Sequence, residues 1–506
     1  MKRPMILAAV ALLLSGWSAT ADVTAPLREV VDEVCSRNAL ASSAVGLLAV
    51  TADGDTLVAV NPELKLVPAS NVKLLTTGLA LKALGPDFRF ETRLGYTGEL
   101  RGGVLHGDLY IVGGGDPTTG SRSTVAEPLS SLFGDWLTLL RKAGIERVEG
   151  RLVGDPRFFD TTTPENLGWS YDDLGTNYGV GPTGLNFFEN AQNFLITPGS
   201  APGAEPNVSP RYPETPWMRY SVSAVTGGRG SANTVYYVNT PLAPLGDFGG
   251  SFPVDRRGYT YEGSNRFGAY TCAWYFLNYL AENDFEVSGG CADISSEGNL
   301  RLEPGFGDTG EAAAAPGALN IIGGTSSANL AAIVAETNHE SNNFYAETLL
   351  KMTGLTGGYS CSGDAAIDAE EELFEVLGVP AGGRCKLVDG SGLSRKNYVS
   401  AGFFVDFLRC MMREPFFETY LRSLPSPGSR GTLEYKFPRE SDEFRARIYM
   451  KSGSMNGILC YSGYILPSAP GGETIVFSLL TNNVTASSWS LSPLIDRIIG
   501  ALAAEN

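Results

Sequence analysis

A serine and a lysine stand three positions apart, Ser70 and Lys73, in the stretch Val-Pro-Ala-Ser-Asn-Val-Lys. Leucines follow at helical spacing, which predicts a helix that begins near Pro68. Residues three apart share one face of a helix, so the lysine amine can lie beside the serine hydroxyl and accept its proton. The pair therefore fits a serine nucleophile activated without histidine, and it also fits a helix cap followed by a solvated lysine.

A second lysine, Lys451, precedes Ser452 and Gly453 near the C-terminal end of the chain. Three β-rich runs predict an antiparallel meander in this region: 448–451, 458–466 and 474–481. The lysine ends the first run, where it and the serine hydroxyl can face an anionic ligand while the glycine lets that ligand approach the backbone. The alternative is a hairpin turn with one solvated lysine.

A third polar cluster contains Ser341 and Asn343, between two stretches with helical periodicity. Such residues can direct a hydroxyl and an amide into a cleft, and they are also common helix caps. The chain thus carries Ser-x-x-Lys, Ser-x-Asn and Lys-Ser-Gly in this order. Together they are similar to the three active-site motifs of penicillin-recognising serine enzymes.

The stretch between Ser70 and Ser341 is far longer than a compact serine β-lactamase needs. This layout resembles the low-molecular-mass class C penicillin-binding proteins, the D-alanyl-D-alanine carboxypeptidase/endopeptidase family. The third motif is Lys-Ser-Gly where that family more often has Lys-Thr-Gly, a change that keeps the hydroxyl. Further stretches extend the resemblance along nearly the whole chain: 106–110 with 113–117, 389–395 with Asn397, and 424–425 with 431–433.

The resemblance implies an α+β fold of the serine β-lactamase/transpeptidase type, in which N- and C-terminal helices cover an antiparallel sheet. We expect a discontinuous catalytic (penicillin-binding) domain at 22–92 and 312–506. The segment between them, 93–311, is expected to be a β-rich insertion that can divide into two subdomains. Residues 1–21 are set aside as a signal peptide.

The resemblance also implies catalytic roles. Ser70 is the expected nucleophile and Lys73 its base, if burial and the nearby charge of Lys451 lower the pKa of Lys73. Ser341 is expected to relay a proton to the departing amine. Asn343 is expected to orient the substrate amide.

Substrate binding is assigned to the third motif and the residue that follows it. Lys451 and Ser452 are expected to receive the terminal carboxylate of the substrate. Gly453 leaves room for the substrate to approach the backbone. The backbone N–H groups of Ser454 and Ser70 are expected to hold the oxyanion of the tetrahedral intermediate.

The expected activity is that of a serine-type D-Ala-D-Ala carboxypeptidase that is also a peptidoglycan DD-endopeptidase. Its partners are stem peptides and cross-links of peptidoglycan, and β-lactam antibiotics as acylating inhibitors; no cofactor is expected. Two alternatives stay open. One is a serine β-lactamase, and the other is a non-catalytic cell-wall-binding protein with the same fold.

The N-terminal end has the features of a secretory signal. Lys2 and Arg3 precede an apolar run at 5–14, and small residues follow at 19–21. We therefore expect export, with the periplasm as the compartment. No later apolar run is long enough to span a bilayer, so we expect no transmembrane segment in the mature chain.

Composition argues against other classes of function. Acidic residues number 55 against 38 Lys and Arg, the formal net charge is −17, and no long basic run occurs, so we expect no nucleic-acid partner. His106 and His339 are the only histidines, and no Cys-x-x-Cys pair occurs. A metal site is therefore not expected.

The chain has 7 cysteines, so at least one is unpaired. In an exported protein the nearest pairs are Cys272 with Cys291 and Cys361 with Cys385, although sequence cannot fix the connectivity. Buried thiols are the preferred alternative.

Overall fold

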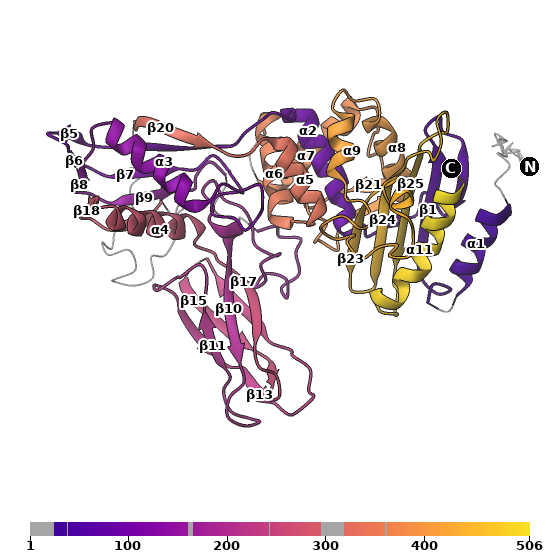
Figure 1. Ribbon diagram of the computed structural model, residues 1–506, viewed down its shortest axis with the longest axis horizontal. Helices are drawn as coiled ribbons and strands as arrows, with labels where there is room; N and C mark the ends of the chain where they lie inside the picture. Colours follow the sequence, from indigo (N-terminus) through magenta and orange to yellow (C-terminus); the bar gives the residue numbers. More distant parts are fainter. Residues whose placement is uncertain are drawn as a thin grey trace, which may run out of the picture.

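The computed structural model describes residues 25–37, 39–159, 165–241, 243–294, 318–359 and 362–505. The expected signal peptide at 1–21 lies outside these ranges. Figure 1 shows an elongated molecule in which both described chain ends lie in one half and the middle of the chain forms the other half. A ribbon of strands projects from that other half.

The half that holds both chain ends is built on a five-stranded antiparallel sheet with the order β2-β1-β25-β24-β23. The predicted C-terminal meander thus pairs with a hairpin from the N-terminal part of the chain, and the two form one sheet. The strands are β1 (Ala44–Thr51), β2 (Thr56–Val60), β23 (Ile448–Met455), β24 (Ile458–Ile465) and β25 (Ile475–Asn482).

Helices cover both faces of this sheet (Figure 1). One apolar core joins one face to α1 (Ala25–Ser36) and α11 (Ser488–Ala504), the two terminal helices. A second core joins the opposite face to a helical cluster. The helices on that side are α2 (Val72–Leu84), α5 (Leu330–His339), α6 (Asn343–Thr356), α7 (Gly363–Val376), α8 (Ala401–Met411) and α9 (Phe417–Ser423).

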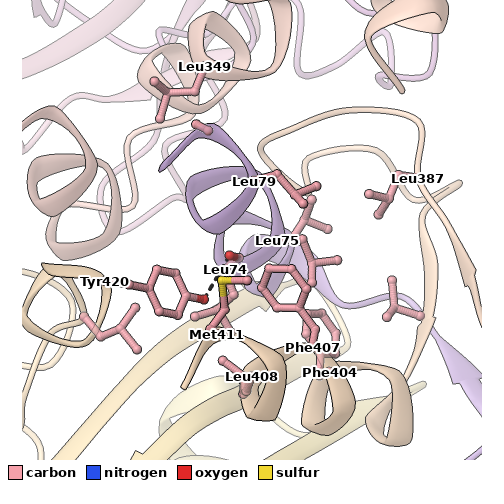
Figure 2. Close-up of a cluster of buried hydrophobic side chains, with 14 of the residues drawn as sticks. Leu74, Leu75, Leu79, Leu349, Leu387, Phe404, Phe407, Leu408, Met411 and Tyr420 are labelled. Carbon is pink, nitrogen blue, oxygen red and sulfur yellow. Dashed lines mark hydrogen bonds between the residues drawn. The ribbon is translucent and has the colours of Figure 1, made fainter. Parts of the chain in front are cut away.

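The helix α2 runs through the second core. Every residue from Val72 to Leu81 is buried, as expected for a helix surrounded by other elements. Figure 2 shows its leucines, Leu74 among them, close to side chains of α8 such as Phe407. The hydroxyl of Tyr420 on α9 donates to the Leu74 carbonyl at 2.9 Å, which fixes the helix from another side. The start of α2 is therefore held rigidly.

The strand β23 is longer than the sequence predicts. We placed the end of the strand at Lys451, but it continues through Ser452, Gly453 and Ser454 to Met455, and only Asn456-Gly457 forms the turn. Its short polar residues look like a loop in the sequence. They pair with β24 on one side, and they lie at the edge of the sheet on the other.

The middle of the chain forms two mixed sheets, β18-β8-β6-β5 and β19-β9-β7-β4-β20, packed against two helices. The bounds are β4 (Glu91–Tyr96), β5 (Glu99–Arg101), β6 (Val104–His106), β7 (Leu109–Val112), α3 (Leu129–Lys142), β8 (Arg147–Val148), β9 (Leu152–Asp155), α4 (Gly268–Glu282), β18 (Glu286–Val287), β19 (Cys291–Asp293) and β20 (Asn320–Ser326).

Short strands between β9 and α4 form the projecting ribbon (Figure 1). They are β10 (Ala191–Thr197), β11 (Asn207–Pro210), β12 (Arg219–Val222), β13 (Val225–Gly227), β14 (Tyr236–Thr240), β15 (Ala243–Gly249), β16 (Ser251–Pro253) and β17 (Tyr259–Ser264). Three shorter elements, β3 (Lys65–Leu66), β21 (Cys385–Lys386) and β22 (Tyr398–Ser400), form a small sheet near the start of α2.

The chain leaves the helical cluster and returns to it through one narrow neck. In the antiparallel pair β4–β20, Glu91 lies opposite Ser326. Just outside this pair, the N–H of Ser327 donates to the Phe90 carbonyl at 2.9 Å, and the Phe90 N–H donates to the Ser327 hydroxyl at 3.0 Å. Because β20 belongs to the inserted sheet, we propose domain boundaries near 91 and 326 in place of 92 and 312.

The cysteines that the structure describes are free thiols, including Cys272 and Cys291, so this suggested pairing is wrong. Burial raises the pKa of the Cys272 thiol well above its usual range. Cys361, of the other suggested pair, lies outside the described residues. Among the described helices, none is long and apolar enough to cross a membrane.

Candidate active site

Ser70 lies on a single 3-10 turn, η1 (Ala69–Asn71), that leads directly into α2. The preceding residue, Ala69, has a φ of 48°, a left-handed conformation that is unusual for alanine. Lys73 is the second residue of α2, and its Nζ lies 3.1 Å from the Ser70 Oγ. The spacing argument thus placed the amine beside the hydroxyl correctly.

The Lys73 amine is fully buried and has three oxygen neighbours. Besides the Ser70 hydroxyl, Nζ contacts Oδ1 of Asn343 at 2.6 Å and the Ser391 carbonyl at 2.7 Å. The last two oxygens can only accept hydrogen bonds. In a neutral amine, two N–H groups would donate to them, and the lone pair would then face the serine hydroxyl.

Burial makes the neutral form of Lys73 accessible. It lowers the pKa of Lys73 from 10.5 to about 7, although the negative charges of Asp389 and Glu347 oppose this shift. A lysine with a pKa near 7 can accept a proton at neutral pH, which an exposed lysine cannot do.

The second lysine, Lys451, is also fully buried. Its Nζ donates to the Ser341 hydroxyl at 3.0 Å and to the Ser452 carbonyl at 2.8 Å. Burial, and then the positive charge of Lys73, lower its pKa. Ser341 has a φ of 57° at the junction between α5 and α6, a left-handed turn that directs its hydroxyl toward β23.

Asn343 joins the catalytic cluster to the inserted region. It is the first residue of α6, whose N-terminus is capped by the Asn342 side chain through the N–H of Tyr345 at 3.0 Å. Its Oδ1 accepts from Lys73, and its Nδ2 donates to the Tyr178 carbonyl at 3.0 Å. Tyr178 belongs to the insertion, so the insertion forms part of the site.

The strand β23 passes close to the turn that carries the serine. A Cβ atom on Gly453 would lie 2.7 Å from the Pro68 carbonyl oxygen and 3.0 Å from the backbone nitrogen of Ser70. Glycine at this position therefore permits the contact between strand and turn. Ser454, the next residue, is exposed, and its backbone N–H is the one expected to hold the oxyanion.

Replacing Gly453 with alanine should separate β23 from the turn at Ser70. We expect β-lactam acylation to slow by about 10²-fold, because misplacing catalytic groups by about 1 Å has an effect of this size. Stopped-flow acylation rates would measure it. Gly228→Ala is the control, since a Cβ at Gly228 meets no atom within 4 Å; equal rates for the two variants would contradict the prediction.

The loop 389–394 contains groups that sequence reasoning did not select. The sequence pattern of this stretch carries the family resemblance but assigns no role to its individual residues. Asp389 is buried, and its carboxylate organises the loop by accepting four hydrogen bonds: from the N–H groups of Gly392 at 2.9 Å and Ser394 at 2.6 Å, from Asn397 Nδ2 at 2.7 Å and from Trp169 Nε1 at 2.8 Å.

Gly392 brings this loop against the turn that carries the serine. It has a φ of 81°, and a Cβ there would lie 2.0 Å from the Ala69 carbonyl oxygen. Trp169, which donates to Asp389, comes from the insertion as Tyr178 does. Two insertion residues thus support the arrangement around Lys73.

A cavity of about 340 Å³ opens beside Ser341 and Asn343. Residues of the insertion, including Arg122 and Tyr178, line its other side. The two histidines take no part in the cluster. His106 pairs with Glu149 at 2.6 Å, and His339 contacts the Arg430 carbonyl at 3.2 Å.

A helix-covered antiparallel sheet, with a serine at the start of a buried helix and two lysines beside it, defines a serine hydrolase of the β-lactamase/transpeptidase-like class. The model of the D-Ala-D-Ala carboxypeptidase 3 (S13) family matches residues 27–240 and 309–499. The chain therefore belongs to this family.

Individual relatives agree with the family assignment. A D-alanyl-D-alanine carboxypeptidase of Actinomadura sp. (strain R39) is 30% identical over 474 residues, which cover 90% of this chain and 81% of that protein. The D-alanyl-D-alanine carboxypeptidase DacB of Haemophilus influenzae is 23% identical over 475 residues, covering 90% and 89%.

The fold is shared with penicillin binding protein 4 (dacB) from Haemophilus influenzae. Its crystal structure superposes with a TM-score of 0.77 at 20% identity, covering 94% of this chain and 98% of that chain. The predicted family, the fold class and the enzyme class, a serine-type D-Ala-D-Ala carboxypeptidase, are thus confirmed.

Proposed function

We propose that Ser70 forms an acyl-enzyme with stem peptides of peptidoglycan, with Lys73 as its base. The observation that carries this proposal is the Lys73 amine, buried and held by Asn343 and Ser391 so that its remaining position faces the Ser70 hydroxyl at 3.1 Å. A buried lysine with two acceptor-only partners is arranged to take a proton.

In the first step, Lys73 removes the proton of Ser70, and Oγ bonds to the carbonyl carbon of the penultimate D-alanine. The N–H groups of Ser70 and Ser454 hold the oxyanion. The terminal carboxylate binds at Lys451 and Ser452, and Gly453 leaves space for the peptide.

In the second step, the C–N bond breaks and D-alanine leaves. Its nitrogen gains the proton that Lys73 took from Ser70, passed on through the Ser341 hydroxyl, which receives a hydrogen bond from Lys451 at 3.0 Å. Asn343 orients the substrate amide. Water then attacks the acyl carbon and gives a proton to Lys73. The bond between the acyl carbon and Ser70 Oγ breaks, and Lys73 returns the proton to Oγ.

Endopeptidase activity requires space for a larger leaving group. The cavity of about 340 Å³ beside Ser341 and Asn343 supports cleavage of cross-links as well as release of D-alanine. The same nucleophile would be acylated by β-lactams; penicillin binding protein 4 of Haemophilus influenzae was solved in complex with a β-lactam. The N-terminal signal supports export to the periplasm.

Intact-mass analysis after mixing with benzylpenicillin tests this proposal. We expect a persistent adduct of one drug mass, which peptide mapping places on Ser70, together with release of D-alanine from a peptide ending in D-Ala-D-Ala. Rapid drug loss without an adduct would instead indicate a serine β-lactamase. Intact drug and no adduct would indicate a non-catalytic wall-binding protein.

The pKa of Lys73 predicts how acylation depends on pH. The base acts as the neutral amine, so protonation below its pKa of about 7 removes it. The acylation rate should therefore be near its maximum above pH 7 and fall about tenfold for each pH unit below 7. Stopped-flow mixing with benzylpenicillin over this range would measure the fall of the acylation rate at low pH, the acid limb of the profile. A rate that stays constant down to pH 5 would contradict Lys73 as the base.

A further inference from the structure

We propose that Glu347 is a positioning residue that orients the Lys73 lone pair through the loop 389–394. This inference rests on the proposed roles of Ser70 and Lys73. Glu347 does not touch the nucleophile or the lysine through a hydrogen bond, and none of the three sequence motifs contains it.

The connection between Glu347 and Lys73 is short. Oε1 of Glu347 accepts the N–H of Ser391 at 2.8 Å and the N–H of Gly390 at 3.1 Å. The carbonyl of the same Ser391 accepts from Lys73 Nζ at 2.7 Å. One carboxylate oxygen thus holds two adjacent peptide groups of the segment that supplies an acceptor to the amine.

The helix α6 positions both acceptors of the Lys73 amine through side chains on one of its faces. Asn343 and Glu347 are four residues apart on this helix, so their side chains lie on the same side. Asn343 reaches the amine directly, and Glu347 reaches it through Ser391. Because one rigid helix fixes these two acceptors, the third hydrogen-bonding direction of the amine points toward Ser70.

Loss of this carboxylate would remove the acceptor of two buried N–H groups. Glu347 is only 4% exposed, so these groups are shielded from bulk water, and an unpaired buried donor is costly. The other end of the loop is held separately by Asp389. Glu347 is therefore specific to the part of the loop that meets Lys73.

Glu347 also acts on the charge of Lys73. The charged groups facing it are Lys73 on α2, Asp389 on the loop and Glu370 on the neighbouring helix α7. Burial, and then the charge of Asp389, raise the pKa of Glu347 to about 7, while ionised Glu347 raises the pKa of Lys73. The next charged residue on the same helix is Lys351, one turn further along, and its amine donates to the Pro182 carbonyl at 3.0 Å.

Two substitutions separate the hydrogen bonds of Glu347 to the loop from the effect of its charge on Lys73. Glu347→Gln keeps an oxygen that can accept both N–H groups but removes the charge, and Glu347→Ala removes both. We expect Gln to retain acylation above pH 7 and to move the acid limb to lower pH, because Lys73 loses a nearby negative charge. We expect Ala to lower the acylation rate by about 10²-fold over the whole pH range.

Glu370→Gln is the matched control. Glu370 is fully buried but makes no hydrogen bond to the loop. Burial, with the charges of Glu347 and Asp389, raises its pKa to about 8, and the charges that act on Lys73 are those of Asp389 and Glu347. This variant should leave the limb where it is in the wild type.

The experiment measures the acylation rate by benzylpenicillin against pH for the full chain and the three variants, with thermal unfolding to establish that each is folded. An unmoved limb in Glu347→Gln, or a wild-type rate in Glu347→Ala, would overturn the inference. An equal shift in Glu370→Gln would overturn it too. If Glu347→Ala does not fold, the position of the acid limb in Glu347→Gln still tests the inference. Failure of the proposed function has a different result, because the wild type would then form no Ser70 adduct.

Discussion

Replacing Ser70 with alanine is expected to abolish the benzylpenicillin adduct and the release of D-alanine. In the proposed mechanism Oγ is the atom that bonds to the acyl carbon, and no other described hydroxyl has a hydrogen bond to the Lys73 amine. Removal of the nucleophile of a serine hydrolase lowers its turnover by about 10⁶-fold. The residual rate of Ser70→Ala should therefore lie below detection. Intact-mass analysis and D-alanine release would both report the loss.

Ser209→Ala is a suitable control for this loss. Ser209 lies on β11 of the projecting ribbon, where its hydroxyl accepts from Asn207 at 3.1 Å. This variant should form the adduct at the wild-type rate. An adduct on Ser70→Ala of the same mass, formed at a comparable rate, would show that another residue is the nucleophile.

Replacing Lys73 with arginine is expected to slow acylation strongly, although less than the loss of Ser70. The positive charge stays, but a guanidinium does not lose its proton at neutral pH, so no base remains beside Ser70. General bases contribute about 10²–10⁴-fold, and the acylation rate should fall by that factor. The pH limb assigned to Lys73 should disappear along with the activity.

Lys65→Arg controls for the exchange of lysine for arginine. Lys65 is exposed on β3, close in sequence to the active-site turn. Its variant should keep the wild-type rate, pH profile and unfolding temperature. Lys73→Arg buries a larger side chain with a permanent charge, so we expect a lower unfolding temperature, and thermal unfolding establishes that it is folded where the rates are measured. A Lys73→Arg enzyme that is folded and acylates normally would exclude the proton-accepting role.

Much of the fold follows from local patterns in the sequence. Three β-rich runs predicted the C-terminal meander, and helical spacing predicted α2. The errors occurred where polar residues form strands. Ser452 to Met455 continue β23 because pairing with β24 satisfies their backbone, and Asn320–Ser326 joins the insertion because it pairs with β4.

The three motifs predicted the site because each depends on spacing within a few residues. The groups that were missed act through the backbone or over long separations. The carbonyls of Ser391 and Tyr178 have no signature in sequence, since any residue supplies a carbonyl. Glu347 reads as an ordinary polar position of α6, and only the packing of α6 against the loop reveals that it is buried.

The narrow neck between β4 and β20 has a consequence for how this enzyme can be divided. Because Glu91 and Ser326 are direct neighbours, a short peptide could join them and shorten the chain without stretching it. The entropic cost of closing a loop grows only slowly with the length of the loop. The long excursion therefore adds little to the free-energy cost of folding the catalytic half. Excision would nevertheless remove Tyr178 and Trp169, two of the insertion residues that contact the site. The excursion is thus detachable in topology, but cutting it out would remove groups that order the surroundings of the proposed nucleophile.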